Sequence, residues 1–262
     1  MDEQTSDITH IAPKLDHKPE FQKVLQNYQP SPQAVEVLKN TPVIALNGPS
    51  STGRNTVIRE LLKTDDYYFI VSDTTRPPRY NDGVLEQNGR EYYFRKETDL
   101  LSDLQQGRFI EAEIIHNQQV SGTSIREIEK AHELNKIAIA DAEIEGVINL
   151  SRLKPDTIVV IFVPPSFDEW VLHRLNKRSK LGESELYNRF QTATKIFKLA
   201  LPQENFHFVI NDKLEDTVKY INDLKNGIND PVKEIKARRL AKELHVEIAD
   251  YLKAHAPEIQ PY

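Results

Sequence analysis

Two glycines that lie five positions apart, directly after a short apolar run, constrain the fold of this chain more than any other feature. Residues 48–56 read Gly-Pro-Ser-Ser-Thr-Gly-Arg-Asn-Thr, and the run before them extends from Val43 to Leu46. A buried strand, a glycine-bounded turn and a helix start form the setting in which backbone N–H groups bind phosphate. The pattern therefore predicts a phosphate-binding loop on a strand–loop–helix unit.

The two positions that follow Gly53 depart from the usual phosphate-loop pattern. Arg54 stands where the pattern has Lys, and Asn55 stands where it has Ser or Thr. Arginine keeps the positive charge and can fork onto phosphate oxygens, whereas the Asn55 carbonyl oxygen is a weaker Mg²⁺ ligand than the usual hydroxyl. Thr56 offers a hydroxyl one position out of register. Because the lysine is missing, a plain turn is the alternative interpretation of these glycines.

Composition excludes several classes of protein. The 262 residues hold 34 Lys and Arg against 40 Asp and Glu, and the net charge of −6 argues against general nucleic-acid binding. Cysteine is absent, which excludes disulfides and suits a reducing cytoplasm. The longest apolar run, Ile158–Val163, is too short to span a bilayer, and the polar start lacks a signal-peptide core. We therefore expect a soluble, cytoplasmic protein without nucleic-acid or membrane partners.

Apolar strand patterns alternate with helical patterns along most of the chain. The strand patterns lie at 43–46, 68–71, 137–140, 157–163 and 207–210. This alternation predicts an α/β fold with a parallel sheet covered by helices on both faces. Residues 73–125 are more polar, and they predict a small mixed insertion over the carboxyl edge of the sheet, where such folds bind ligands.

Helical patterns also predict an extension at each end of the chain, over residues 1–40 and 228–262. The first extension contains helix candidates at 18–28 and 32–39, and the second is one helix that Asp230 can cap. The second helix carries an apolar stripe of Val232, Ile235, Leu240, Leu244, Ile248 and Leu252. Since water rarely faces such a stripe, we expect it to pack on the main domain or on a second copy. A homo-oligomer formed through the terminal helices is therefore one alternative.

Two groups of arginines suit the binding of anionic ligands. Arg76 and Arg79 lie three apart beside two prolines, and a stiff pair of this kind can clamp a phosphate or carboxylate. Arg174 and Arg178 lie four apart on one helical face, and Arg189 could join them if the two helices fold back as a lid. The alternatives are a solvated turn for the first group and a solvated basic face for the second.

Seven segments resemble the guanylate kinase family, in the family's order and over most of residues 42–226. They are the Ser-x-Thr-Thr-Arg-x-Pro-Arg of Ser72–Arg79 after the Gly-Pro-Ser loop, Asn88–Tyr92, Phe109–Glu111, Gly122–Ser124, Asp141–Glu143 before Gly146, the three lid arginines, and Asn211-Asp212. The resemblance implies a guanylate kinase-like domain at 41–227, with a monophosphate-binding insertion at 73–125 and a lid at 172–190. It also implies a P-loop fold that binds ATP, GMP and Mg²⁺.

Carried over to these positions, the resemblance implies a GMP site in the insertion. Arg76, Arg79 and Tyr92, helped by Ser72, would hold the phosphate of GMP. Glu111 would accept hydrogen bonds from guanine N1–H and the 2-amino group, the Thr123 hydroxyl would reach O6, and Glu143 would lie near the guanine edge. A carboxylate that faces N1 pairs with guanine but meets a bare acceptor in adenine, which leaves a buried charge unpaired.

The resemblance also implies an ATP site and a set of catalytic residues. The ATP-binding residues would be Gly48, Ser50, Ser51, Thr52, Gly53, Arg54, Asn55, Thr56 and Asn211. Arg54, Arg174, Arg178, Arg189 and Asp141 would be the catalytic residues, with Asp141 and Asn55 as the Mg²⁺ ligands. An alternative for Asp141 and Glu143 is a pair of helix-capping carboxylates.

We therefore expect phosphoryl transfer from ATP to GMP, giving ADP and GDP. Four departures from the family pattern qualify this expectation: Arg54, Asn55, Glu143 in place of Asp, and Ser121 in place of a phosphate-binding Tyr. The altered loop predicts slow turnover. The alternative is a catalytically impaired module of the same family that binds GMP or a phosphorylated partner, although such a module has no need of lid arginines.

Overall fold

The structure, a computed structural model, describes residues 15–81, 83–115, 117–175 and 182–255. Contacts within the chain divide it into two compact units. The smaller unit comprises Met1–Val35 and Val71–Glu127, and the larger unit comprises Glu36–Ile70 and Ile128–Tyr262. Two separate segments of the chain thus form the smaller unit.

The larger unit is built on a five-stranded sheet in which every pair of neighbouring strands is parallel. The strand order is β11-β10-β1-β9-β2. The strands are β1 (Val43–Asn47), β2 (Tyr67–Phe69), β9 (Ile137–Asp141), β10 (Ile158–Val163) and β11 (Phe206–Ile210). All five residues of β1 are buried, as expected for a central strand of a parallel sheet. The predicted α/β fold with a parallel sheet is confirmed.

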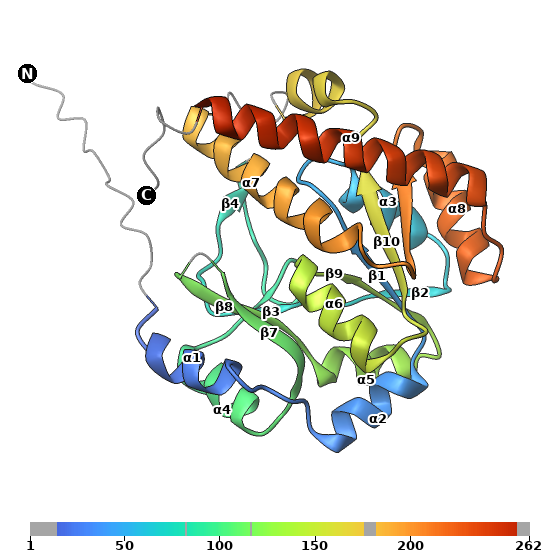
Figure 1. The fold of residues 1–262 in the computed structure, drawn as a ribbon. Coiled ribbons are helices and arrows are strands. Elements are labelled where there is room, and N and C mark those ends of the chain that lie inside the picture. Colours follow the sequence, from blue (N-terminus) through green and yellow to red (C-terminus); the bar gives the residue numbers. More distant parts are fainter. Residues whose placement is uncertain (1–14, 82, 116, 176–181, 256–262) are drawn as a thin grey trace, which may run out of the picture. The chain divides into compact units, whose positions relative to one another are not determined.

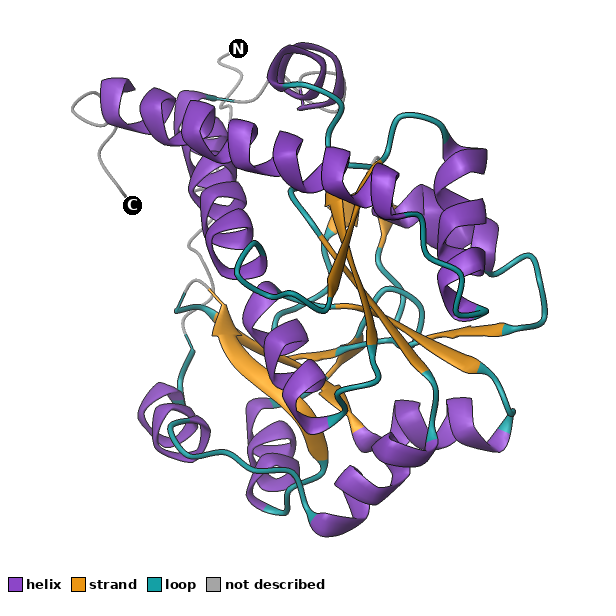
Figure 2. Cartoon of the chain, turned by 45° about the vertical axis from the view of Figure 1, so that its right-hand side comes forward, coloured by secondary structure: helices purple, strands orange, loops and turns teal. Residues whose placement is uncertain are grey.

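Helices lie on both sides of this sheet (Figure 2). The helices that lie wholly within the larger unit are α3 (Arg54–Leu61), α6 (Ile144–Leu153), the π-helical η1 (Glu169–Leu175), α7 (Glu183–Ala200), α8 (Leu214–Lys225) and α9 (Pro231–His255). On one face, apolar side chains of α3 and α8 pack against Ile44, Leu46 and Phe162. The predicted cap of α9 is present, because Asp230 Oδ1 accepts the Lys233 N–H at 3.1 Å. Ser166 Oγ accepts the Glu169 N–H at 3.1 Å in the same way at the start of η1.

The C-terminal helix α9 packs on its own unit, alongside α7 and β11 (Figure 1). The predicted apolar stripe is only partly correct. Val232 and Ile235 are 78% and 69% exposed, and the buried residues of this helix are Ala237, Ala241, Leu244 and Ile248. Small alanines at two of these positions let the helix approach its neighbours closely. Packing on the main domain is therefore confirmed, whereas a homo-oligomer through this helix stays a prediction.

The smaller unit contains a four-stranded sheet of order β6-β3-β8-β7 and a two-stranded hairpin. Its elements are α1 (Lys18–Leu25), β3 (Asp73–Thr74), β4 (Tyr80–Asn81), β5 (Val84–Leu85), β6 (Tyr93–Phe94), α4 (Glu97–Gln105), β7 (Phe109–Ile115) and β8 (Gln119–Ser124). The sheet is mixed, because β3 pairs with β6 in parallel and with β8 antiparallel. Phe21 of α1 is fully buried in a core with Leu100, Leu104 and Phe109.

Two further helices belong in part to each unit, α2 (Pro32–Asn40) and α5 (Ile125–Glu133). Over the described parts of the chain, no helix combines the length and the apolar character needed to cross a membrane.

Candidate active site

The two glycines of the phosphate loop are required by close packing. A Cβ atom on Gly48 would lie 2.7 Å from the backbone oxygen of Phe162, so the loop can leave β1 beside β10 only without a side chain. Gly53 has a positive φ of 90° and caps α3, and a Cβ there would lie 2.5 Å from the Asn211 amide nitrogen. The spacing that stands out in the sequence is therefore a steric requirement of the strand–loop–helix unit.

The loop between these glycines presents unpaired backbone N–H groups. Among the described residues, the N–H groups of Ser51 and Gly53 form no backbone hydrogen bond, whereas Ser50 and Ser51 form a turn that brings the N–H of Thr52 toward the Pro49 carbonyl. Other polar groups of the loop are already used, since the Thr52 hydroxyl donates to the Pro49 carbonyl at 2.8 Å. The Asn211 side-chain amide, from the end of β11, donates to the Thr52 carbonyl at 2.6 Å. A turn that leaves its amides available at a helix N-terminus is suited to bind an anion.

Arg54 lies against the loop and the end of a neighbouring strand. Its Nε atom is 2.9 Å from Asp141 Oδ1, and its Nη1 atom donates to the Gly48 carbonyl. Burial raises the pKa of Asp141 above its usual range, and the guanidinium of Arg54 opposes that shift. Both side chains retain 21% exposure, so they are within reach of a bound ligand. The arginine that replaces the usual lysine thus lies beside the loop, in contact with Asp141.

The residues of this site fit a magnesium ion that nucleotide phosphates help to hold. Asp141 ends β9 next to Leu46 of β1, at the carboxyl edge of the sheet where the loop begins. Asn55 and Thr56 lie exposed in the first turn of α3. Mg²⁺ is commonly bound by one or two carboxylates together with substrate phosphates and water. Among the described residues no three His, Asp or Glu side chains gather as a metal site, so the phosphates would have to supply most of the ligands.

Arg189 of α7 reaches the same loop. Its Nη1 atom lies 3.4 Å from Ser50 Oγ, and its Nη2 atom lies 2.6 Å from Glu185 Oε1. Of the other predicted lid arginines, Arg178 lies outside the described residues. Arg174 belongs to η1, but its side chain is also outside the described part of the chain. The structure therefore brings one lid arginine to the phosphate loop.

The predicted phosphate clamp of the smaller unit contains a buried ion pair. The guanidinium of Arg76 donates to both oxygens of Glu86, at 2.6 and 3.0 Å, and each side chain is only 6% exposed. The Arg76 guanidinium carbon lies 4.7 Å from the centre of the Tyr92 ring. Burial opposes the charge on Arg76, but the contacts with Glu86 and Tyr92 together outweigh it and raise the pKa of Arg76. Arg79 differs, because its backbone N–H donates to Glu86 whereas its side chain is exposed.

The two predicted guanine-reading residues are neighbours across β7 and β8. Glu111 and Thr123 are paired in register, and the Thr123 N–H donates to Glu111 Oε1 at 2.9 Å. Gly122 makes this approach feasible, since a Cβ atom there would lie 2.4 Å from the Glu111 backbone oxygen. Ser72 precedes β3 in the same unit, and its carbonyl accepts the Tyr93 N–H at 2.9 Å.

Two further predicted positions take local roles. Ser121, where the family has a tyrosine, donates from its hydroxyl to Thr74 Oγ1 at 2.8 Å and lies buried in the sheet. Glu143 is the first residue before α6, in the larger unit, and its side chain is exposed. Its carboxylate makes no capping hydrogen bond, and Asp141 binds Arg54 instead. The alternative of two helix-capping carboxylates is therefore wrong.

Comparison with known proteins agrees with this geometry. The profile of the guanylate kinase family matches residues 39–227. The chain belongs to the guanylate kinase family. A guanylate kinase of Corynebacterium jeikeium is 32% identical over 190 residues, which cover 71% of this chain and 97% of the relative. One of Clostridium tetani is 29% identical over 211 residues, covering 79% and 98% of the two chains.

A solved structure shares the fold. The guanylate kinase from Anaplasma phagocytophilum superposes with a TM-score of 0.53 and 21% sequence identity, covering 79% of this chain and 97% of that one. The family match ends at residue 227. Helix α9 therefore lies beyond the residues that the family profile matches.

Three residues that contact the predicted site were not recognised in the sequence. Glu185 lies four residues before Arg189 on the same helix, a spacing from which their pairing could have been predicted. Glu86 is separated from Arg76 by a hairpin, and no local periodicity links the two. Trp170 donates its indole N–H to the Ser50 carbonyl at 2.8 Å, a contact between segments 120 residues apart. Only the folded chain reveals the last two.

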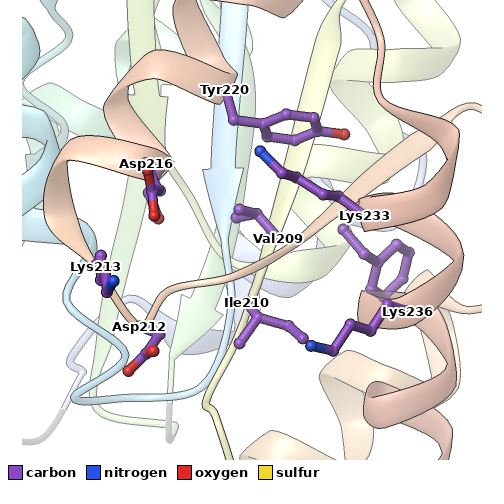
Figure 3. Close-up of a pocket in the computed structure, with 10 residues that line it drawn as sticks. Val209, Ile210, Asp212, Lys213, Asp216, Tyr220, Lys233 and Lys236 are labelled. Carbon is purple, nitrogen blue, oxygen red and sulfur yellow. The ribbon is translucent and has the colours of Figure 1, made fainter.

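A cavity of about 320 Å³ opens beside β11, between α8 and α9 (Figure 3). Val209 and Ile210 of β11 line it, and the side chains of Lys233 and Lys236 extend toward it from α9. None of the predicted ATP- or GMP-binding residues is among those that line it. This cavity is therefore distinct from the phosphate loop, although two of its lining residues, Ile210 and Asp212, flank Asn211 in the sequence.

Proposed function

We propose that this chain transfers the γ-phosphoryl group of ATP to GMP, giving ADP and GDP. The observation that carries the proposal is the phosphate loop itself, where unpaired amides lie beside Arg54, Asp141 and Arg189. Membership of the guanylate kinase family supports the same reaction. A loop that only bound a nucleotide would have no need of a second arginine from α7.

The acceptor side of the reaction is assigned to the smaller unit. Glu111 accepts hydrogen bonds from guanine N1–H and the 2-amino group, and the Thr123 hydroxyl donates to O6. Arg79, Arg76 and Tyr92 bind the phosphate of GMP, and Ser72 assists them. The pairing of Glu111 with Thr123 across two strands holds both groups on rigid elements, which favours precise recognition of the base. Glu143, which belongs to the larger unit, is the exception and is proposed to lie at the guanine edge.

The donor side is assigned to the larger unit. The loop amides and Arg54 bind the β- and γ-phosphates, Asn211 fixes the loop from behind, and Arg189 neutralises charge on the group in transfer. Asp141 and Asn55 would hold Mg²⁺, which when bound stabilises negative charge on the phosphate oxygens. A phosphate oxygen of GMP attacks the γ-phosphorus, the bond to the β–γ bridging oxygen breaks, and ADP leaves. Such a transfer depends mainly on positioning and charge, so no general base is assigned.

A second candidate function rests on the departures in the loop. Asn55 replaces a hydroxyl ligand, and Asp141 is already paired with Arg54 at 2.9 Å. A module that binds GMP or a phosphorylated partner without turnover would tolerate both features. A slow kinase is the intermediate case, because the Mg²⁺ and phosphate geometry would be less favourable than with Lys and Ser.

The two candidates differ in the products they form. The purified chain is incubated with ATP and Mg²⁺ and with GMP, dGMP, AMP or UMP, and the nucleotides are separated by chromatography. A guanylate kinase forms GDP from GMP and leaves AMP and UMP unchanged. If GMP binds by calorimetry but no diphosphate forms at high protein concentration, the binding module is the correct candidate.

A further inference from the structure

An aromatic cluster joins the C-terminal helix to the segments that carry the lid arginines. It consists of Phe167, Trp170, Phe190 and Tyr251. Tyr251 of α9 meets Phe190 of α7 edge to face at 4.9 Å, and Phe190 lies 5.4 Å from Trp170. Trp170 and Phe190 are fully buried, so their positions are fixed by packing. Tyr251 itself lies beyond the family match, which ends at residue 227.

The cluster ends on the phosphate loop. The Trp170 indole N–H donates to the carbonyl of Ser50 at 2.8 Å. In a trans peptide group the carbonyl and the following N–H point in opposite directions, so this bond turns the N–H of Ser51 away from Trp170. Ser51 adopts a positive φ of 61°, a conformation that a non-glycine residue keeps only when its surroundings hold it. The indole therefore fixes the direction of one of the amides assigned to phosphate.

The same cluster also controls the direction of Arg189. Phe190 is its neighbour on α7, and burying Phe190 against Trp170 and Tyr251 fixes the rotation of that helix. Arg189 then projects from the next position, where its Nη1 atom lies 3.4 Å from Ser50 Oγ. Two contacts with Ser50 thus depend on one packed cluster.

We infer that Tyr251 is a positioning residue for the phosphate loop, acting through Phe190 and Trp170 on Ser50 and Arg189. The C-terminal extension would then be part of the donor site and more than a stabilising appendage. Its effect on catalysis rests on the proposed kinase function, whereas its effect on the loop does not. Removing the Tyr251 ring should loosen Trp170, let the Ser50 carbonyl rotate, and lower the affinity for ATP.

The experiment compares Tyr251→Ala with two controls on the same helix. Tyr251→Phe keeps the ring and should behave as the native chain. Leu244→Ala removes another buried side chain of α9, outside the aromatic cluster, and reports the cost of weakened helix packing alone. The first readout is the amide NMR spectrum of the free protein. Because the chain has one tryptophan and nine glycines, the indole signal and the Gly53 amide signal can be assigned by substitution.

Tyr251→Ala should shift both signals, while Tyr251→Phe and Leu244→Ala leave Gly53 unchanged. The second readout is calorimetric titration with ATP and with GMP. We expect Tyr251→Ala to weaken ATP binding roughly three- to tenfold, a loss in the range of one aromatic contact, and to leave GMP binding unchanged. Trp170→Phe, which removes the indole N–H, should weaken ATP binding similarly.

The inference is overturned if Tyr251→Ala and Leu244→Ala show the same Gly53 signal and the same ATP affinity. The effect of Tyr251→Ala on the melting temperature does not change this conclusion. A failure of the proposed function has a different signature. If the native chain binds no ATP, the kinase proposal fails, and the Gly53 signal alone decides whether Tyr251 positions the loop.

Discussion

Three of the predicted phosphate-binding arginines are each paired with a carboxylate. Arg54 pairs with Asp141, Arg76 with Glu86, and Arg189 with Glu185. Such ion pairs fix the guanidinium groups before a nucleotide arrives. They also mean that a phosphate must share or displace an internal anion. The pairing should therefore favour precise positioning over high affinity.

Base recognition is the first residue-level claim open to test. Glu111→Gln keeps the size of the side chain but removes the charge that accepts guanine N1–H. Binding of GMP should weaken by about 1–3 kcal/mol, because one polar contact to the base is no longer met. Binding of ATP should stay the same. Calorimetric titration of both nucleotides checks this, and equal losses for GMP and ATP would make Glu111 a structural residue.

The two clamp arginines should respond differently to removal. Arg79→Ala takes away an exposed side chain, so the Michaelis constant for GMP should rise while the melting temperature stays unchanged. Arg76→Ala removes one partner of a pair that is 6% exposed on each side. It leaves the buried Glu86 carboxylate without its bidentate guanidinium partner, which costs roughly 3–5 kcal/mol of stability. Thermal unfolding and steady-state kinetics separate the two effects, and a large loss of stability in Arg79→Ala would contradict this assignment.

At the residue scale the sequence predicted the ligand-facing groups better than their partners. The sequence pattern marks Gly48, Gly53, Arg54, Asp141 and Asn211, and these residues lie around one loop. No sequence pattern indicates Glu86 or Trp170, because their contacts cross a hairpin or join distant segments. The roles assigned to the site residues remain predictions.

At the scale of elements, strand patterns located the sheet correctly, and periodicity alone misjudged the C-terminal helix. Long apolar residues such as Val232 and Ile235 suggested its buried face, yet the helix buries Ala237 and Ala241. A pattern based on large apolar residues does not identify the buried face of a helix that packs through small residues. The contact of α9 is also polar at one end, where Glu234 accepts from Arg238 and meets His207 and Asn229.

This polar end should make the docking of α9 sensitive to acid. Burial raises the pKa of Glu234, but the contacts with His207, Asn229 and Arg238 outweigh it, and the pKa is lowered overall. A lowered pKa stabilises the fold above the unfolded value of about 4.3 and loses that contribution as the pH falls further. Glu234→Gln should therefore lower the melting temperature at pH 7, and the difference from the native chain should shrink toward pH 3.

Glu243→Gln is the matched control for that variant. Glu243 pairs with Arg239 on the same helix, but the two side chains are 58% and 80% exposed. Exposed pairs of this kind contribute little, so the control should melt as the native chain does at every pH. If both variants behave alike, the polar contact of α9 does not set its acid sensitivity.

At the scale of the whole molecule, the chain devotes one unit to each proposed substrate. The loop for ATP lies in the larger unit, and the clamp and base-reading pair for GMP lie in the smaller one. The polar composition of residues 73–125 predicted the mixed insertion. It did not predict that α1 adds Phe21 to the core of the smaller unit, because that packing joins distant segments. The boundaries 41–227 and the lid at 172–190 remain predictions.

The altered phosphate loop decides whether the molecule as a whole is an enzyme. The most direct measurement is GDP formation from ATP and GMP by the native chain and by Arg54→Ala, with GMP affinity measured in parallel. The account predicts measurable GDP from the native chain and a loss of roughly 10²–10³ in turnover for the variant, with GMP affinity nearly unchanged. The contrasting variant Arg54→Lys with Asn55→Ser should turn over faster than the native chain if the loop limits the rate. Absence of GDP from the native chain at high protein concentration would contradict the account.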